Sequence, residues 1–275
     1  MSGTILVGAH VEDDEGDTIG LAVELARAFG ARLLLGGVHV PSGEPGDAEA
    51  RNELTAEVVG LRDAVPDDIG STTQVVDAIS VVRGLHDLAE EHDADLLVIG
   101  AHHRTGLLRA LRADLAAELA FTAPCGVVVA LPGEGSGGLR RLGVAWDQTP
   151  PANAALEWAI GLTERTAGEL QIMRVLDPSH PEGTHPGRHE QVRLAAAAEE
   201  AALRAPARAQ VLWGDPAPEL IKASRGLDLL VMGSRAHGHV RRALFGSVST
   251  RVLHEARCPV AVLPTGTVAP TPRAA

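Results

Sequence analysis

The sequence predicts an α/β protein built from two tandem domains, each an open, five-stranded parallel sheet of the Rossmann-like kind. The first observation is a repeat. Asp95-Leu-Leu-Val-Ile-Gly100 returns 133 positions later as Asp228-Leu-Leu-Val-Met-Gly233 in a chain of 275 residues. The second is that the apolar runs are continuous, as in sheets covered by helices on both faces. The third is that Ala/Leu/Glu-rich segments alternate with these runs, which is typical of crossover helices.

The predicted strands follow the same order in both halves. In the first half they lie near 4–10, 31–40, 72–77, 95–100 and 126–131, and in the second near 140–146, 169–176, 208–213, 228–233 and 259–264. Stretches such as 154–160 and 187–204 are expected to form crossover helices. Right-handed crossovers bring the carboxyl ends of the strands to one edge, where such sheets bind ligands at the point where the strand order reverses.

Composition indicates where the domains begin and end. We expect a first domain over 1–132, a Gly-rich flexible linker over 133–138, a second domain over 139–264 and a flexible tail over 265–275. Cys125 and Cys258 are also 133 positions apart, each just before an apolar run. Their duplication favours a shared structural position over catalysis or a disulfide.

Charge and composition exclude several classes of partner. The net charge is −12, the chain has one lysine, and aromatic residues make up 2%. This balance argues against nucleic acid and anionic membrane as ligands, because no basic field is present to neutralise phosphates. No apolar run reaches the roughly 18 residues that would cross a bilayer, and the first residues lack the features of a signal peptide. A soluble cytoplasmic protein is the expectation.

The loop after Gly233 carries the chemistry. It ends in Gly246 and Ser247, and an apparent helix follows, with Ser249 and Thr250 in its first turn. Glycine allows close backbone approach, and a helix N-terminus offers free N–H groups and partial positive charge, so the segment could cradle a phosphate. An ordinary strand-to-helix loop with a serine N-cap is the alternative.

Two further turns have both a functional and a structural interpretation. Asp147, at the end of the first strand of the second half, could accept a hydrogen bond from a ribose hydroxyl or a base amino group, or could cap the helix that follows. Trp213-Gly-Asp-Pro216 ends the third strand, and a helix-starting Asp-Pro turn is favoured there.

These motifs together resemble the universal stress protein family. The nucleotide motif of that family is Gly, two residues, Gly, nine residues, then Gly-Ser or Gly-Thr; here Gly233, Ala236 and Gly246-Ser247 stand at those positions. Family-like segments are also found at 144–147, 174–177, 214–217 and 257–260. The resemblance covers nearly the whole chain as a tandem pair and implies a fold like that of the adenine nucleotide α-hydrolases.

The resemblance implies ATP as the ligand of the second half, with or without Mg²⁺. Asp147 and Val175 would face adenine and ribose, while Gly233 and the 246–249 segment would hold ribose and phosphates. The candidate contacts are Ala145, Asp147, Val175, Met232, Gly233, Arg235, Gly246, Ser247, Val248 and Ser249. Ala236 departs from the motif, and if its position needs a positive φ the cost is roughly 1 kcal/mol.

The first half departs further from the motif. At the same spacing it has Gly100, His103 and Ala113-Asp114, and a carboxylate there would repel a phosphate. His10 replaces the acid at the end of the first strand, and 76–79 (Val-Asp-Ala-Ile) replaces the Gly-Asp-Pro turn. We expect this half to bind ATP poorly or not at all.

The resemblance therefore implies a regulatory, stress-response protein that holds one ATP and acts through nucleotide-dependent conformation or an unidentified protein partner, with at most slow ATP hydrolysis. The alternative is an interaction protein of the same fold that binds no nucleotide. A P-loop and a Gly-x-Ser-x-Gly elbow are missing, and no Gly-x-Gly-x-x-Gly turn follows the first strand of either half. The histidine cluster at 180–189 does not have the spacing of a zinc motif. Strands 126–131 and 259–264 could pair as an intramolecular pseudo-dimer, and a homodimer of the tandem is left open.

Overall fold

The computed structural model describes residues 3–8, 16–100, 115–131, 138–177, 186–234 and 247–264. Contacts divide the described chain into two compact units, one reaching to residue 131 and the other running from 138 to 264. Each unit is described by itself. Within the described ranges, no helix combines the length and the apolar character that crossing a bilayer requires.

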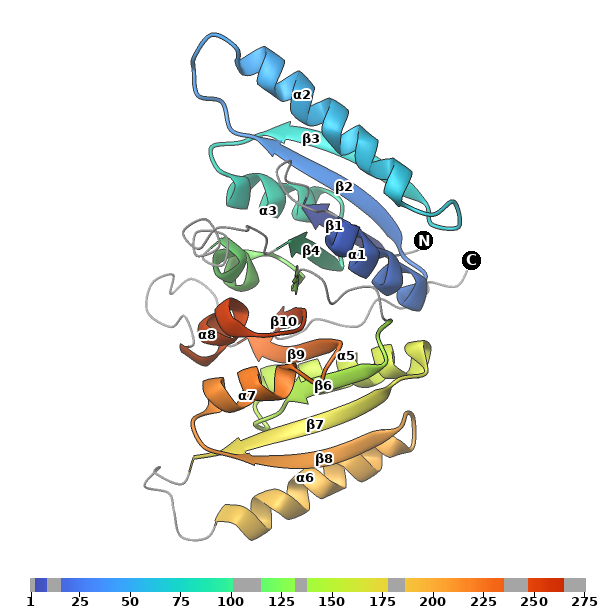
Figure 1. Cartoon of the computed structure of the whole chain (residues 1–275), viewed down its shortest axis with the longest axis vertical. Helices are drawn as coiled ribbons and strands as arrows, with labels where there is room; N and C mark the ends of the chain where they lie inside the picture. Colours follow the sequence, from blue (N-terminus) through green and yellow to red (C-terminus); the bar gives the residue numbers. More distant parts are fainter. Residues whose placement is uncertain are drawn as a thin grey trace. The chain divides into compact units, whose positions relative to one another are not determined.

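The first unit alternates strands and helices around a parallel sheet (Figure 1). Its elements are β1 (Thr4–Gly8), α1 (Gly16–Phe29), β2 (Arg32–His39), α2 (Asp47–Gly60), the 3-10 helix η1 (Leu61–Ala64), β3 (Ser71–Asp77), α3 (Val81–Glu91), β4 (Leu96–Gly100) and β5 (Gly126–Ala130). Residues 115–122 are also helical. The strand order is β3-β2-β1-β4-β5 and every pairing is parallel.

The second unit repeats this topology. Its elements are β6 (Arg141–Ala145), α5 (Pro150–Thr166), β7 (Glu169–Leu176), α6 (Pro186–Ala202), β8 (Ala207–Trp213), α7 (Pro216–Ser224), β9 (Leu229–Ser234), α8 (Ser247–Glu255) and β10 (Val260–Pro264). The order β8-β7-β6-β9-β10 is again parallel. The predicted pair of five-stranded, open parallel sheets is confirmed, and the order reverses between β6 and β9.

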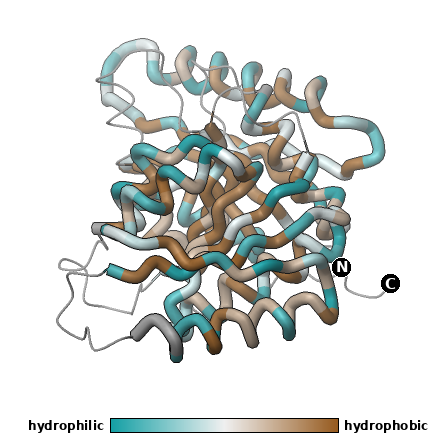
Figure 2. Tube along the Cα trace, turned by 60° about the horizontal axis from the view of Figure 1, so that its bottom comes forward, coloured by the Kyte–Doolittle hydropathy of each residue, from teal (hydrophilic) through white to brown (hydrophobic). Residues whose placement is uncertain are grey.

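The strands form the core of each unit because both of their faces are covered. β1, β4, β5 and β10 are buried along nearly their whole length. Figure 2 shows that hydrophobic residues concentrate in the strands, whereas the helices mix hydrophobic and hydrophilic positions. This distribution explains why the apolar runs in the sequence do not alternate.

Two neighbouring glycines in β2 show how closely the helices cover both faces. A Cβ atom on Gly36 would lie 3.0 Å from Leu88 of α3, and one on Gly37 would lie 2.8 Å from Val58 of α2. Adjacent strand residues point to opposite faces. Helices α2 and α3 therefore pack on opposite faces of this sheet.

The acid of the repeated motif ties two strands together at their amino ends. The Asp95 Oδ2 atom accepts a hydrogen bond from the Thr4 amide at 2.8 Å, which joins the start of β4 to the start of β1. In the second unit, Asp228 Oδ2 accepts from the amides of Arg140 and Arg141 at 3.0 and 2.7 Å. The same carboxylate is bound by the Arg141 guanidinium at 2.6 Å. The duplicated acid thus has a structural role in each unit.

The duplicated cysteines also have equivalent positions. Cys125 and Cys258 are buried thiols just before β5 and β10. Burial raises the pKa of the Cys125 thiol to about 12, so that this thiol stays protonated. Both cysteines therefore occupy the same position in the core of their unit, as the duplication predicts.

Proline is the first residue of two helices at the carboxyl edge of the second sheet. Helix α5 starts at Pro150 after the N-cap Thr149, and α7 starts at Pro216 after the N-cap Asp215. Proline suits the first helical turn because its missing N–H would have no intrahelical partner there. The expected helix-starting turn at 213–216 is confirmed, and Gly214 supplies its positive φ of 138°.

Candidate functional site

Strand register brings three of the candidate residues to one edge of the second sheet. Ala145, the last residue of β6, lies beside Met232 of β9 on one side and Met173 of β7 on the other. Gly233 follows Met232 and lies beside Leu263 of β10. This edge holds the carboxyl ends of the strands at the point where their order reverses, which is where open α/β sheets bind ligands.

Asp147 lies two residues beyond β6, in the turn that enters α5. Its Oδ1 atom accepts hydrogen bonds from the Thr149 amide at 3.1 Å and from the Thr149 hydroxyl at 2.5 Å. The side chain is half-buried. Asp147 therefore bonds within the turn that precedes α5, whose N-cap is Thr149, and does not cap the helix itself. An additional contact with a ligand stays a prediction.

Gln148 is held at the same edge by a residue from α6. It has a φ of 67°, in the left-handed region that non-glycine residues rarely adopt. Its Nε2 atom donates to Glu190 Oε2 at 2.6 Å, and Arg174 Nε lies 3.4 Å from the same oxygen. Sequence reasoning did not predict this cluster, because Glu190 is 42 positions from Gln148 and no local motif links them.

The remaining candidates fall on β7, on α8 and on segments outside the described residues. Val175 is half-buried on β7, two positions after Met173. Helix α8 begins at Ser247, and Val248 and Ser249 in its first turn are half-buried. Arg235 and Gly246 lie outside the described residues, as do Ala236 and the rest of the loop.

Packing explains why both copies of the repeated motif end in glycine. A Cβ atom on Gly233 would lie 2.7 Å from the Ala152 amide nitrogen and would also meet the carbonyl group of Pro151. A Cβ atom on Gly100 would lie 2.8 Å from the Thr18 hydroxyl of α1. In each unit the first helix crosses the end of the fourth strand. The glycine alone therefore does not distinguish a nucleotide site from a packed strand end.

Helix α8 offers the features of an anion site at its amino end. The hydroxyl Oγ1 of Thr250 is buried and has no hydrogen-bond partner among the described residues. Arg251 in the next position lies 3.6 Å from Asp215 and 3.2 Å from Glu255, so that its charge is directed toward carboxylates. The N–H groups of the first turn and the dipole at a helix N-terminus favour a negatively charged group.

The matching edge of the first unit has a different chemistry. Asp77 Oδ1, at the end of β3, lies 3.0 Å from both His39 Nδ1 and Arg51 Nε. Hydrogen bonds from His39 and then Arg51 lower the pKa of this carboxyl. The departures expected to prevent ATP binding, at His10, His103 and 113–114, lie outside the described ranges.

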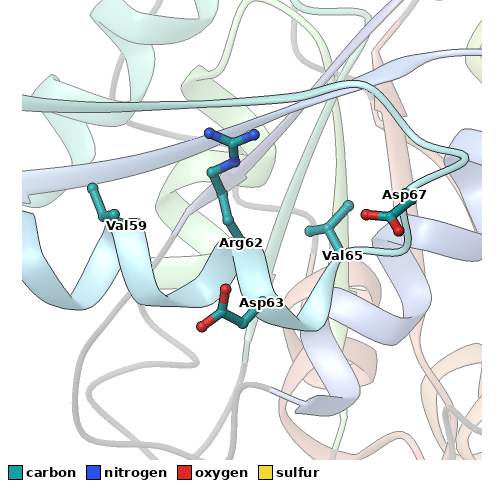
Figure 3. Close-up of a pocket in the computed structure, with 5 residues that line it drawn as sticks. All are labelled: Val59, Arg62, Asp63, Val65 and Asp67. Atoms are coloured by element: carbon teal, nitrogen blue, oxygen red, sulfur yellow. The ribbon is translucent and has the colours of Figure 1, made fainter.

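Two other features do not coincide with the predicted site. An open hollow of about 430 Å³ lies at the end of α2 and η1, near the amino end of β3 (Figure 3). It is lined by Val59, Arg62, Asp63, Val65 and Asp67. On α3, His86 Nδ1 lies 3.6 Å from Asp87 and 3.7 Å from Glu90, but Asp87 is also paired with Arg83 at 2.9 Å. The histidines near 180–185 lie in a segment that the structure does not describe.

Comparison with known proteins agrees with the duplicated architecture. The profile of the Universal stress protein family matches residues 1–130 and again 138–264. The Universal stress protein Rv2624c of Mycobacterium tuberculosis (strain H37Rv) is 27% identical over 139 residues, which cover 48% of this chain. The chain spans about half the length of this curated relative, 51%.

Solved structures show the same fold over the whole chain. A universal stress protein from Archaeoglobus fulgidus DSM 4304 superposes with a TM-score of 0.76 at 18% identity, covering 97% of both chains. Another solved relative, with a TM-score of 0.36 and 21% identity, is a universal stress protein in complex with cAMP; it covers 46% of this chain and 96% of its own. The tandem profile match, the repeated topology and the full-length superposition lead to one conclusion: this chain belongs to the universal stress protein family.

Proposed function

We propose that the second unit binds one ATP and that the protein acts as a stress-response regulator through nucleotide-dependent conformation or partner binding. The observation that supports this proposal most directly is the register at the carboxyl edge. It places Ala145 beside Met232, which Gly233 follows in the chain. Asp147 lies two residues beyond Ala145. These are the positions at which the family resemblance expects the base and the ribose.

The residues at this edge divide into two groups by the part of ATP they would hold. Asp147 and Val175 would contact adenine and ribose, because Asp147 lies two residues beyond β6 and Val175 is the penultimate residue of the adjacent strand β7. The first turn of α8, with Ser249 and the buried Thr250 hydroxyl, would face the phosphates. A helix N-terminus supplies backbone N–H donors and partial positive charge to such a group. Arg235 and Gly246 would complete this cradle.

A regulatory role is proposed rather than rapid turnover. Among the described carboxylates at this edge, Asp147 and Glu190 already accept hydrogen bonds from neighbouring side chains, and Asp215 lies 3.6 Å from the Arg251 guanidinium. Any Mg²⁺ would then be held mainly by the nucleotide phosphates and water. Slow hydrolysis is the most that such an arrangement supports.

The alternative is an interaction protein that binds no nucleotide. The local bonds of Asp147 and the packing of Gly233 against α5 favour it, since each accounts for a motif residue without a ligand. Ala236 in place of the motif glycine also favours a protein that binds no nucleotide. The pseudo-dimer of the two halves stays a prediction under either function.

The decisive measurement is the nucleotide content of the purified full-length chain. Denaturation followed by chromatography should release about one ATP per chain, and stripped protein should rebind ATP in a calorimetric titration. Gly246→Glu should abolish binding, because a carboxylate at the phosphate position repels the ligand.

Gly226→Glu provides the matched control. Gly226 is exposed after α7, and the nearest heavy atom to an added Cβ would be 3.8 Å away. The same change of charge there should leave ATP binding intact. Wild-type protein that neither carries nor rebinds nucleotide would support the interaction-protein alternative.

A further inference from the structure

The side chain of Glu190 bridges the two segments that flank the proposed base site. Its Oε2 atom accepts from Gln148 Nε2 at 2.6 Å, and the Arg174 guanidinium lies 3.4 Å from the same oxygen. Gln148 directly follows Asp147, and Arg174 directly precedes Val175. One carboxylate on α6 thus connects the neighbours of both proposed base contacts.

The turn after β6 needs this support. Gln148 has a φ of 67°, and a residue with a side chain adopts the left-handed region at a cost of about 1–2 kcal/mol. The Oε1 atom of the same amide is buried and accepts no hydrogen bond from the residues that the structure describes. The bond to Glu190 is therefore the contact that fixes the amide, and with it the orientation of the turn that carries Asp147.

Burial makes the bridge effective. The side chains of Arg174 and Glu190 are 22% and 23% exposed, so water screens their interaction less than it would at an open surface. A hydrogen bond to a charged acceptor is about twice as strong as one between neutral groups. Backbone strain that is held in place by surrounding contacts is typical of functional sites.

We propose that Glu190 is a positioning residue for nucleobase recognition: it sets the spacing between Asp147 and Val175 and so makes the site select adenine. This role rests on the proposed binding of ATP to the second unit. Glu190 acts through Gln148 and Arg174. The phosphates, held at α8, do not depend on it.

The test compares ATP and GTP, which differ only in the base, on the full-length chain. Wild type should bind ATP more tightly than GTP. Glu190→Ala should weaken ATP binding about tenfold, the effect of losing one hydrogen bond to a charged group, while GTP affinity changes less than twofold. Glu190→Gln should recover most of the preference, because its amide oxygen still accepts from Gln148.

Two variants make the result interpretable. Gln148→Gly keeps the left-handed backbone without strain and removes the amide, so it should reduce the ATP preference as Glu190→Ala does. Glu199→Ala, an exposed substitution on the same helix, should leave the preference unchanged. Tight ATP binding with the same ATP/GTP ratio in Glu190→Ala and wild type would overturn the positioning role and leave the proposed function standing. A wild type that binds neither nucleotide would overturn both.

Discussion

At Gly233 the main chain of β9 lies against the first turn of α5, and the atoms in the way of a side chain are backbone atoms of Pro151 and Ala152. Backbone atoms cannot move away from a clash as the end of a flexible side chain can. Any residue larger than glycine at position 233 must therefore displace the helix. The same helix start carries the turn that holds Asp147. A change at Gly233 therefore affects the fold and the proposed site together.

Gly233→Ala is expected to lower the free energy of unfolding by about 1–3 kcal/mol, the usual cost of overpacking a filled core. Chemical denaturation monitored by circular dichroism measures the change. Gly226→Ala is the control, because its Cβ would have ordinary contacts, and it should change stability by less than about 0.5 kcal/mol. Equal stabilities for the two variants would contradict the packing assigned to Gly233.

At the scale of elements, two carboxylates attach the amino-terminal part of α2 to its surroundings. Asp47, at its start, accepts from the Ser42 hydroxyl at 2.7 Å and from the amides of Ser42 and Gly43 at 3.1 and 2.8 Å. Asp77, at the end of β3, pairs with Arg51 of α2. Hydrogen bonds to Ser42 and Gly43 lower the pKa of Asp47, and those from His39 and Arg51 lower that of Asp77.

Lowering the pH should therefore weaken the contacts that hold α2 in place. The pKa of each carboxyl is lower in the folded chain than in the unfolded chain, where it is near 3.8. Such a group stabilises the fold fully above the unfolded pKa, and this stabilisation is lost as the pH falls through the folded pKa. We expect amide exchange in α2 to rise below about pH 4, measured by pulsed hydrogen–deuterium labelling. Asp47→Asn should show weaker attachment already at pH 7 and a smaller further change in acid. A pH-independent difference between variant and wild type would contradict this linkage.

For the whole molecule, duplication produced two units with one topology and different edges. The second unit has Asp147, Gln148 and α8 at its carboxyl edge, whereas the described part of the first has His39, Arg51 and Asp77. Each unit contains its own core of buried strands. We therefore expect ATP binding in the second unit to leave the core of the first unit unchanged.

Saturating ATP should protect amides selectively in the second unit. At a ligand concentration 100 times the dissociation constant, binding stabilises the folded state by about 2.7 kcal/mol. Hydrogen–deuterium exchange should slow in β6, β9 and α8, while β1 and β4 exchange at the same rate with and without ATP. Comparable protection of β1 and β4 would contradict the assignment of one nucleotide site to the second unit.

Much of this architecture could be predicted from local patterns. Continuous apolar runs identified the strands, because a strand covered on both faces has no polar face to alternate. The repeated Asp-Leu-Leu-Val motif identified the duplication, and the structure shows its acid joining the fourth strand to the first in each unit. Asp215-Pro216 correctly indicated a helix start, since that preference is local to the first turn.

The sequence by itself determined the two parallel α/β units, because periodicity and turn chemistry are encoded over a few residues, and its motifs resemble those of the universal stress protein family. The order of the strands within each sheet came from the tertiary structure. Only the tertiary structure decided that Gly233 packs against α5, that Asp147 bonds to Thr149, and that Glu190 reaches Gln148 from α6. The bond to Glu190 joins residues 42 positions apart. Such a contact depends on where a crossover helix is placed on the sheet, and no local pattern specifies that placement.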